Sequence, residues 1–163
     1  MKTMPAPDAP AHAHTFEHVS RFAGATAAEC RTFHAAPGAF ARLTPPPIFV
    51  QVHRDSIRDL VAGDVEFTLW FGPIPVRWHA QHAPGINATS FVDYQVSGPL
   101  AYWYHEHMIS DVPGGVELRD RLTIAHKPGL VGLLTRLAFD GLPLRLLFIY
   151  RHLRTRLALR RAA

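Results

Sequence analysis

The sequence is short of cysteine and of long hydrophobic runs, and each shortage excludes a class of protein. Cys30 is the single cysteine, so no intramolecular disulfide can form, which fits a reducing compartment. A lone cysteine in an amphipathic helical segment is more often a core residue than a nucleophile. No apolar run is long enough to cross a bilayer, and the N-terminus lacks the apolar region of a signal peptide. We therefore predict a cytoplasmic protein.

Signatures of cofactors and metals are missing as well. No nucleophile motif, cofactor fingerprint or complete set of metal ligands is recognisable. His105 and His107 form an H-x-H pair, which places two imidazoles on one face of a strand, as in cupins. A cupin adds a nearby glutamate and a later histidine, whereas Glu117 is expected to face outward here. We therefore expect neither a cofactor nor a bound metal.

Lysine is scarce among the basic residues. Arginine supplies 15 of the 17 basic residues, which looks like coding bias rather than an adaptation to nucleic acid. Six arginines crowd the C-terminal end, namely Arg145, Arg151, Arg154, Arg156, Arg160 and Arg161. The simplest interpretation is a solvated helix face. We expect no nucleic-acid partner, and peripheral membrane contact stays open as an alternative. The sequence does not indicate an oligomeric state.

Length and composition indicate one folded domain. A chain of 163 residues with 48% hydrophobic and 18% charged residues can bury a core without disulfides or metal. Residues 1–13 are rich in Ala, Pro and His and are predicted to form a flexible arm. Residues 14–163 are predicted to form a single domain.

The predicted elements begin with one strand and two short helices. A strand is expected over residues 15–22. Thr26 and Glu29 have the spacing of a capping box, which opens a helix that ends before Pro37. A second short helix over residues 39–43 is stopped by the prolines at 45–47. Further strands are expected over residues 48–53, 64–71, 76–83 and 116–125, and two antiparallel strands within residues 91–109 flank a turn signal at Ser97–Gly98–Pro99.

The C-terminal part changes from strand to helix periodicity. A short apolar helix is expected after Pro128, and a long helix begins near Pro143 and runs to about Arg160. One stripe of that helix is predicted to pack on the sheet, and it contains Leu146, Ile149, Tyr150, Leu153 and Leu157. His152, Arg156 and Arg160 lie off the stripe. This order predicts an α+β helix-grip fold: a curved antiparallel sheet of six or seven strands around a long C-terminal helix.

The hairpin over residues 91–109 has an unusually polar face. Alternation places Asp93 and Gln95 on the same face as Phe91, and Trp103, His105 and His107 on one face of the next strand. A turn at Gly98–Pro99 puts Asp93 opposite His105 and Gln95 opposite Trp103. A two-residue loop at Pro113–Gly114 puts Asp120 opposite His107. Such groups are costly to bury unless they pair, so they form either a satisfied core network or a site.

These residues resemble a motif of the START-like superfamily, also called SRPBCC. This superfamily includes polyketide cyclases, Bet v 1-like carriers and lipid-transfer domains. The resemblance is strongest to small bacterial proteins of unassigned function and covers residues 14–160. It rests on Phe91, Asp93, Gln95, Gly98, Pro99, Leu100, Trp103, His105, His107, Asp120, Leu122, Tyr150 and Arg151. Leu100 replaces a commoner aromatic residue, and Met108–Ile109 replaces an aromatic after the second histidine.

Two functions are compatible with this resemblance. The first is binding or carriage of a hydrophobic small molecule, such as a lipid, isoprenoid or polyketide-like compound, between the sheet and the C-terminal helix. Its predicted ligand-binding residues are Phe91, Gln95, Trp103, Asp120, Phe148 and Arg151. The alternative is a cyclase- or dehydratase-like enzyme with Asp93, His105 and His107 as candidate acid–base groups. A purely structural network of Asp–His pairs, with Arg151 as a further carboxylate partner, explains the same residues.

Overall fold

The computed structural model describes residues 8–162, with side chains to residue 160, and shows seven strands and four helices in this range. The strands are β1 (His14–Ala23), β2 (Phe49–Asp55), β3 (Asp64–Phe71), β4 (Ile74–Pro84), β5 (Phe91–Ser97), β6 (Tyr102–Val112) and β7 (Gly115–Ala125). The helices are α1 (Ala27–Ala35), α2 (Ala39–Arg42), α3 (Gly129–Phe139) and α4 (Gly141–Ala162). Residues 8–13 contain neither helix nor strand, and the remainder of the predicted arm lies outside the described residues.

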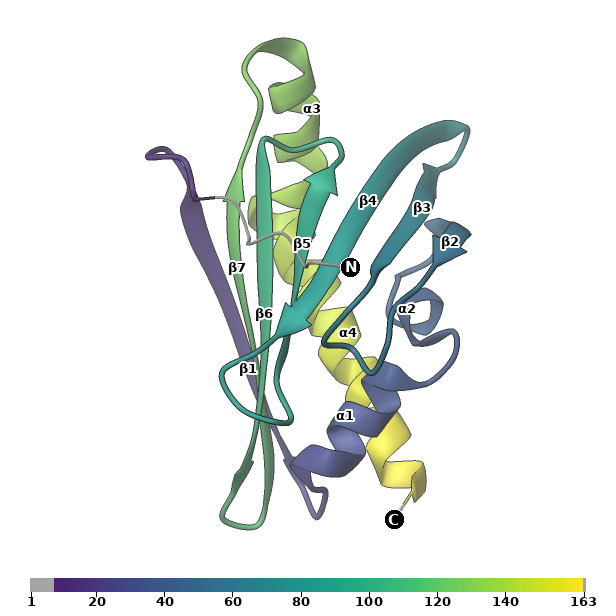
Figure 1. Cartoon of the computed structure of the whole chain (residues 1–163), viewed down its shortest axis with the longest axis vertical. Coiled ribbons are helices and arrows are strands. Elements are labelled where there is room, and N and C mark those ends of the chain that lie inside the picture. Colours follow the sequence, from purple (N-terminus) through teal and green to yellow (C-terminus); the bar gives the residue numbers. More distant parts are fainter. Residues whose placement is uncertain (1–7, 163) are drawn as a thin grey trace.

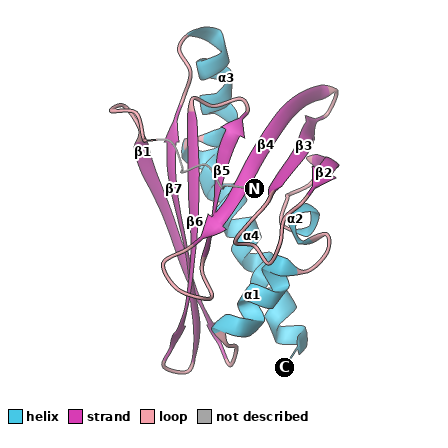
Figure 2. Cartoon of the chain, viewed as in Figure 1, coloured by secondary structure: helices cyan, strands magenta, loops and turns pink. Residues whose placement is uncertain are grey.

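All seven strands form one antiparallel sheet in the order β1-β7-β6-β5-β4-β3-β2. The sheet curves around α4, and α1 and α2 lie near one end of it (Figures 1 and 2). The predicted order of elements and the predicted fold class are confirmed.

Local sequence signals set most element boundaries. Thr26 and Glu29 form the predicted capping box, in which the Glu29 backbone N–H donates to Thr26 Oγ1 and the Thr26 N–H donates to Glu29 Oε2. The Pro113–Gly114 turn is tight, because Val112 pairs with Gly115. This turn brings His107 opposite Asp120, as predicted. Asp93 likewise lies opposite His105.

The interior contains two hydrophobic clusters with polar residues between them. Trp103 on β6, Leu122 on β7 and Phe148 on α4 belong to the first cluster. The second cluster contains Ile109, Leu118 and Leu159 from the same three elements. Between the clusters each element carries buried polar side chains, namely His105 and His107 on β6, Asp120 on β7, and His152 and Thr155 on α4. We call this set, together with Asp93 of β5, the polar layer.

The predicted buried face of α4 is wrong. Four members of the predicted stripe, Leu146, Ile149, Leu153 and Leu157, are between 42% and 55% exposed. The buried face instead contains Leu144, Phe148, His152, Thr155 and Leu159. Both sets have helical spacing, and the less hydrophobic set is buried because the sheet presents the Asp120 carboxylate to it. The His152 side chain on this face is hydrogen-bonded to that carboxylate.

No helix in the described part of the chain has the length and apolar character required to cross a membrane.

Candidate functional site

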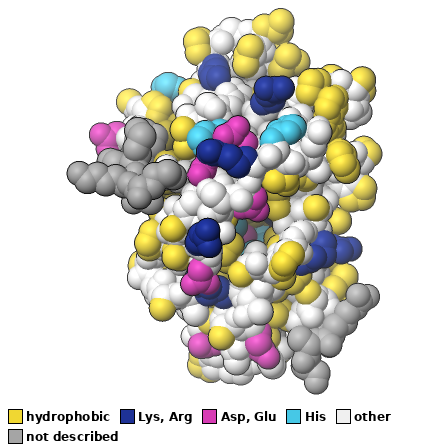
Figure 3. All heavy atoms as spheres, turned by 45° about the vertical axis from the view of Figure 1, so that its right-hand side comes forward, with side chains coloured by type: hydrophobic (Ala, Val, Ile, Leu, Met, Phe, Trp, Pro, Cys, Tyr) yellow, Lys and Arg dark blue, Asp and Glu magenta, His cyan; other side chains and the backbone are white. Residues whose placement is uncertain are grey.

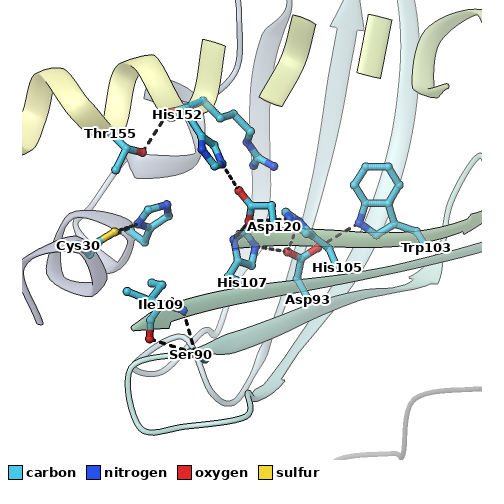
Figure 4. A network of polar contacts seen from close by, with 12 residues as sticks. Cys30, Ser90, Asp93, Trp103, His105, His107, Ile109, Asp120, His152 and Thr155 are labelled. Carbon is cyan, nitrogen blue, oxygen red and sulfur yellow. Dashed lines mark hydrogen bonds and ion pairs between the residues drawn. The ribbon is translucent and has the colours of Figure 1, made fainter. Parts of the chain in front are cut away.

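The polar layer joins three strands of the sheet to α4 (Figure 4). Asp93, His105, His107 and Asp120 point inward from β5, β6 and β7 because they share the pleat with the apolar residues of the two clusters. His152 approaches the same carboxylates from the helix. The structure therefore brings together the four sheet residues predicted from the sequence.

Each strand histidine lies between the two carboxylates. His105 Nε2 is 3.0 Å from Asp120 Oδ1, and its Nδ1 is 3.1 Å from Asp93 Oδ2. His107 Nε2 is 2.9 Å from Asp93 Oδ2, and its Nδ1 is 2.8 Å from Asp120 Oδ1. His152 Nε2 donates to Asp120 Oδ2 at 2.7 Å. The two carboxylates and the three imidazoles thus form one connected network.

In this network the attraction between opposite charges changes the pKa values more than burial does. Burial alone would lower the pKa of His105, but the Asp93 charge and hydrogen bonding to Asp120 raise it to about 9. Burial opposes ionisation of Asp93 too, yet the charge and close contact of His105 and the hydrogen bond from His107 hold the pKa of Asp93 well below its usual range. The pKa of Asp120 is depressed in the same way, against burial, by the charge and close contact of His107 and by hydrogen bonds from His105 and His152. At neutral pH the carboxylates are therefore ionised and His105 is protonated.

Some polar atoms of the network lack a hydrogen-bond partner among the described residues. The Nδ1 atoms of His105, His107 and His152 are buried without an aligned hydrogen bond among the described residues. For His105 and His107, the short Nδ1–carboxylate distances are therefore ion-pair contacts rather than directed hydrogen bonds. Asp93 is the least buried member, because 20% of its side chain is exposed whereas the other four members are at most 7% exposed. Contact between solvent and the polar layer is thus greatest at Asp93.

Other residues surround the network without joining its ion pairs. Trp103 Nε1 donates to Asp93 Oδ1 at 3.2 Å, and the Phe91 ring stacks on His107 with centroids 4.1 Å apart. His34 of α1 lies 6.0 Å from His107 between ring centroids, and burial together with the charge of His107 lowers the pKa of His34 to about 4. Burial also raises the pKa of the Cys30 thiol to about 12, so Cys30 is a core thiol rather than a nucleophile.

Two predicted ligand-binding residues, Gln95 and Arg151, have other neighbours than expected. The registered β5–β6 pairs end with Tyr94 opposite Tyr104, so Gln95 is not paired with Trp103. The Gln95 amide instead donates to the Leu100 carbonyl and accepts from its N–H, which closes the β5–β6 turn. Arg151 forms no ion pair with a described carboxylate, and its guanidinium lies 5.6 Å from the Phe148 ring centroid. Phe148 is fully buried in the first cluster.

His152 is the network member that the sequence prediction missed. A leucine-rich stripe was the stronger hydrophobic signal, and that stripe placed His152 off the buried face. A weaker signal was present, because two inward carboxylates on the sheet require counter-charges. Leu144, Phe148 and His152 recur every fourth residue, which puts a histidine on one face with two apolar residues.

Among residues 8–160, three groups of side chains have the composition of a metal site, and they are Asp93–His105–His107, Asp64–Glu66–His79 and His14–His126–Asp140. In the first group His105 and His107 already contact the Asp93 and Asp120 carboxylates through both ring nitrogens, at 2.8–3.1 Å. In the second group Asp64 is already bonded to Ser56, His79 and Arg54. In the third group Asp140 bridges His14 and His126 and caps the first turn of α4 at Gly141. Internal pairing accounts for the last two groups.

Comparison with known proteins identifies the fold. No family model and no curated protein matches the sequence. Solved structures do match, including protein CV1439 from Chromobacterium violaceum, with a TM-score of 0.68 at 11% identity over 90% of this chain and 97% of that chain. Norcoclaurine synthase from Thalictrum flavum gives 0.63 at 13% identity over 93% and 97%. The Zhui aromatase/cyclase from Streptomyces gives 0.60 at 13% over 91% and 92%. The chain has the helix-grip fold.

In this helix-grip chain a hollow lies where the sheet opens. The registered β4–β5 pairs begin at His79 opposite Ser97, so residues 74–78 of β4 pair only with β3. A hollow of about 740 Å³ follows this free edge, and residues 75–79 line it together with residues 97–99 of the β5–β6 turn. Phe67 and Trp78 form its apolar side, and both belong to the first core cluster. A second hollow of about 510 Å³ lies between β1 and α4.

Neither hollow contains a predicted ligand-binding residue. The second is lined by Phe16, His18, Arg145 and Ile149 with their β1 neighbours. The binding roles of the six predicted residues remain predictions.

Proposed function

We propose that the protein binds an amphipathic small molecule, such as a lipid, isoprenoid or polyketide-like compound, at the free edge of β4. The observation that carries this proposal is the hollow of about 740 Å³ beside Trp78, since ligand pockets typically occupy roughly 300–1,000 Å³. Trp78 contacts Trp103 and Phe139, with ring centroids 5.2 and 5.6 Å apart. An apolar ligand body placed against Trp78 therefore extends the first core cluster.

The other side of the hollow is suited to a polar head group. His53, Arg77 and His79 line it, with Glu66 nearby. On the face of the molecule seen in Figure 3, basic, acidic and histidine side chains gather in the upper half. The unpaired edge of β4 adds backbone donors and acceptors that no β5 residue uses. These groups favour a ligand that is apolar along most of its length and carries one polar end.

The alternative of a cyclase- or dehydratase-like enzyme has less support. Norcoclaurine synthase and the Zhui aromatase/cyclase share the fold, but at 13% identity they support no transfer of activity. A general base works best with a pKa near the working pH. The ionised carboxylates of the polar layer have pKa values far below neutrality, and His105 is already protonated. The polar layer is thus better suited to holding the core together.

Native mass spectrometry of freshly purified protein, combined with titration of a fluorescent fatty acid, tests the binding proposal. Val76→Trp fills the hollow from the half-buried edge of β4, and we expect more than about tenfold weaker probe binding at an unchanged melting temperature. The matched control is Val19→Trp, on exposed β1, which should bind normally.

Two outcomes would contradict the proposal. The first is a protein that carries no apolar compound and binds no probe. The second is unchanged binding by Val76→Trp combined with loss of binding in a variant of the β1–α4 hollow, such as Ile149→Glu. The second outcome would place the ligand beside α4 instead.

A further inference from the structure

The outer surface of the two C-terminal helices carries ten exposed aliphatic side chains. On α3 they are Leu130, Val131, Leu133, Leu134 and Leu137, and on α4 they are Leu142, Leu146, Ile149, Leu153 and Leu157. Each is between 42% and 70% exposed. We call this set the helical apolar surface. In Figure 3 hydrophobic side chains crowd the top of the molecule, where α3 lies. Scattered single exposed leucines are normal, but a set this dense on adjoining helices indicates an interaction surface.

The spacing shows that the α4 residues form one stripe. Leu142, Leu146, Ile149, Leu153 and Leu157 follow one another at intervals of four, three, four and four residues. The opposite face of α4 packs in the protein interior, where Phe148 and His152 are buried. α4 therefore has a buried face that packs on the sheet and an exposed apolar stripe, and only the buried face has a partner within the described residues.

The charge around the helical apolar surface has one sign. Arg136 on α3 and Arg145, Arg154, Arg156 and Arg160 on α4 are exposed. The four α4 arginines each lie three residues from a member of the stripe, which is one helical turn. Among residues 126–160 the sole carboxylate side chain is Asp140, and it is bonded to His14, His126 and the Gly141 N–H. The surface therefore combines aliphatic area with uncompensated positive charge.

This combination of aliphatic area and positive charge distinguishes two candidate partners for the surface, a second copy of the chain and an anionic bilayer. A second copy of the chain in a two-fold dimer would place the same surface against itself and bring arginines together without acidic partners. An anionic bilayer offers an acyl region for the leucines and negative head groups for the arginines, whose long side chains can reach those groups from one turn away. We propose that α3 and the exposed stripe of α4 dock onto an anionic membrane surface. This inference does not depend on the ligand proposed above.

Co-sedimentation with vesicles tests the proposal. The full-length protein should bind vesicles of phosphatidylcholine mixed with phosphatidylglycerol, should bind phosphatidylcholine alone much more weakly, and should dissociate as salt is added. The double variant Leu134→Gln/Leu137→Gln removes two exposed leucines of α3 and should lower the partition coefficient by more than about tenfold. Arg145→Gln/Arg156→Gln should lower it by roughly 30-fold, because each cation near an anionic surface contributes a factor of about five.

The matched control is Ile74→Gln/Ile86→Gln, which removes two comparably exposed aliphatic residues outside the two helices. Its vesicle binding should equal that of the unaltered protein. Failure to bind phosphatidylglycerol vesicles overturns the proposal, as does an equal loss in control and helix variants. Light scattering tests whether a second copy of the chain occupies the surface instead. A dimer that dissociates in the leucine variants would show that a second copy covers this surface. Because Val76→Trp leaves both helices intact, it should retain vesicle binding even if ligand binding fails.

Discussion

At the scale of single residues, opposite charges stabilise the polar layer, and removing one of them would cost a large part of the free energy of folding. Asp120 is 3% exposed and contacts three imidazoles, so removing any one partner leaves an uncompensated group between two apolar clusters. The strand pairing that creates these contacts also fixes the register of β5, β6 and β7, because a shift by one residue would point every member at the wrong face. The layer thus contributes specificity as well as free energy.

Asp120→Asn tests whether this layer is structural. The amide removes the negative charge shared by His105, His107 and His152, and we expect the free energy of unfolding to fall by about 3–5 kcal/mol. Urea denaturation followed by circular dichroism measures this loss. Glu17→Gln is the control, because Glu17 forms exposed ion pairs with Arg119 and Arg121 and should change stability by less than about 1 kcal/mol. An Asp120→Asn protein as stable as the control would remove the structural explanation and favour an acid–base role.

At the scale of elements, sequence periodicity predicted the helices and strands but not the face that α4 buries. The capping box at Thr26 and the turn at Pro113–Gly114 act within a few residues, so both could be recognised from the sequence. The orientation of α4 depends on a contact between His152 and Asp120, which are 32 residues apart. Two stripes of helical spacing compete in α4, and hydrophobicity alone selects the wrong one.

Two neighbouring substitutions test the observed orientation of α4. Phe148 is fully buried and packs against Phe16 and His105, with ring centroids 5.3 and 5.2 Å apart. Phe148→Ala should therefore cost about 3–5 kcal/mol through lost burial and the cavity left behind. Ile149 is 51% exposed, so Ile149→Ala should cost less than about 1 kcal/mol. Urea denaturation of both variants gives the comparison, and a larger loss for Ile149→Ala would support the stripe predicted from the sequence.

At the scale of the whole molecule, the order of elements was sufficient to predict the fold, whereas the surroundings of the site were not predictable. Asp93, His105, His107 and Asp120 lie on consecutive strands, so hairpin geometry alone brings them together. His34 and His152 come from α1 and α4, and their approach depends on how the helices pack on the curved sheet. The opening beside β4 was also missed, because it depends on where the β4–β5 pairing ends.

His34 and His105 predict a stability maximum near pH 6.5 for the whole protein. His34 has a pKa lowered from 6.5 to about 4, so the unfolded state binds more protons in that interval and stability is lost as pH falls through it. His105 has a pKa raised from 6.5 to about 9, so the folded state binds more protons and stability is lost as pH rises through that interval. We call the stability loss below pH 6.5 the acid limb and the loss above it the alkaline limb. In each limb the free energy of unfolding should fall by on the order of 3 kcal/mol. The lowered pKa values of Asp93 and Asp120 deepen the loss below pH 4, the acid end of the His34 interval.

Urea denaturation at a series of pH values from 4 to 9 measures both limbs. His34→Gln should reduce the acid limb and leave the alkaline limb, because the glutamine does not titrate and His105 is unchanged, while His18, His82 and His126, whose pKa values burial also lowers, keep part of the acid limb. His12→Gln, an exposed change before β1, should leave both limbs in place. A stability that stays constant between pH 6.5 and 9 would show that His105 does not carry the proton that its two carboxylate partners require.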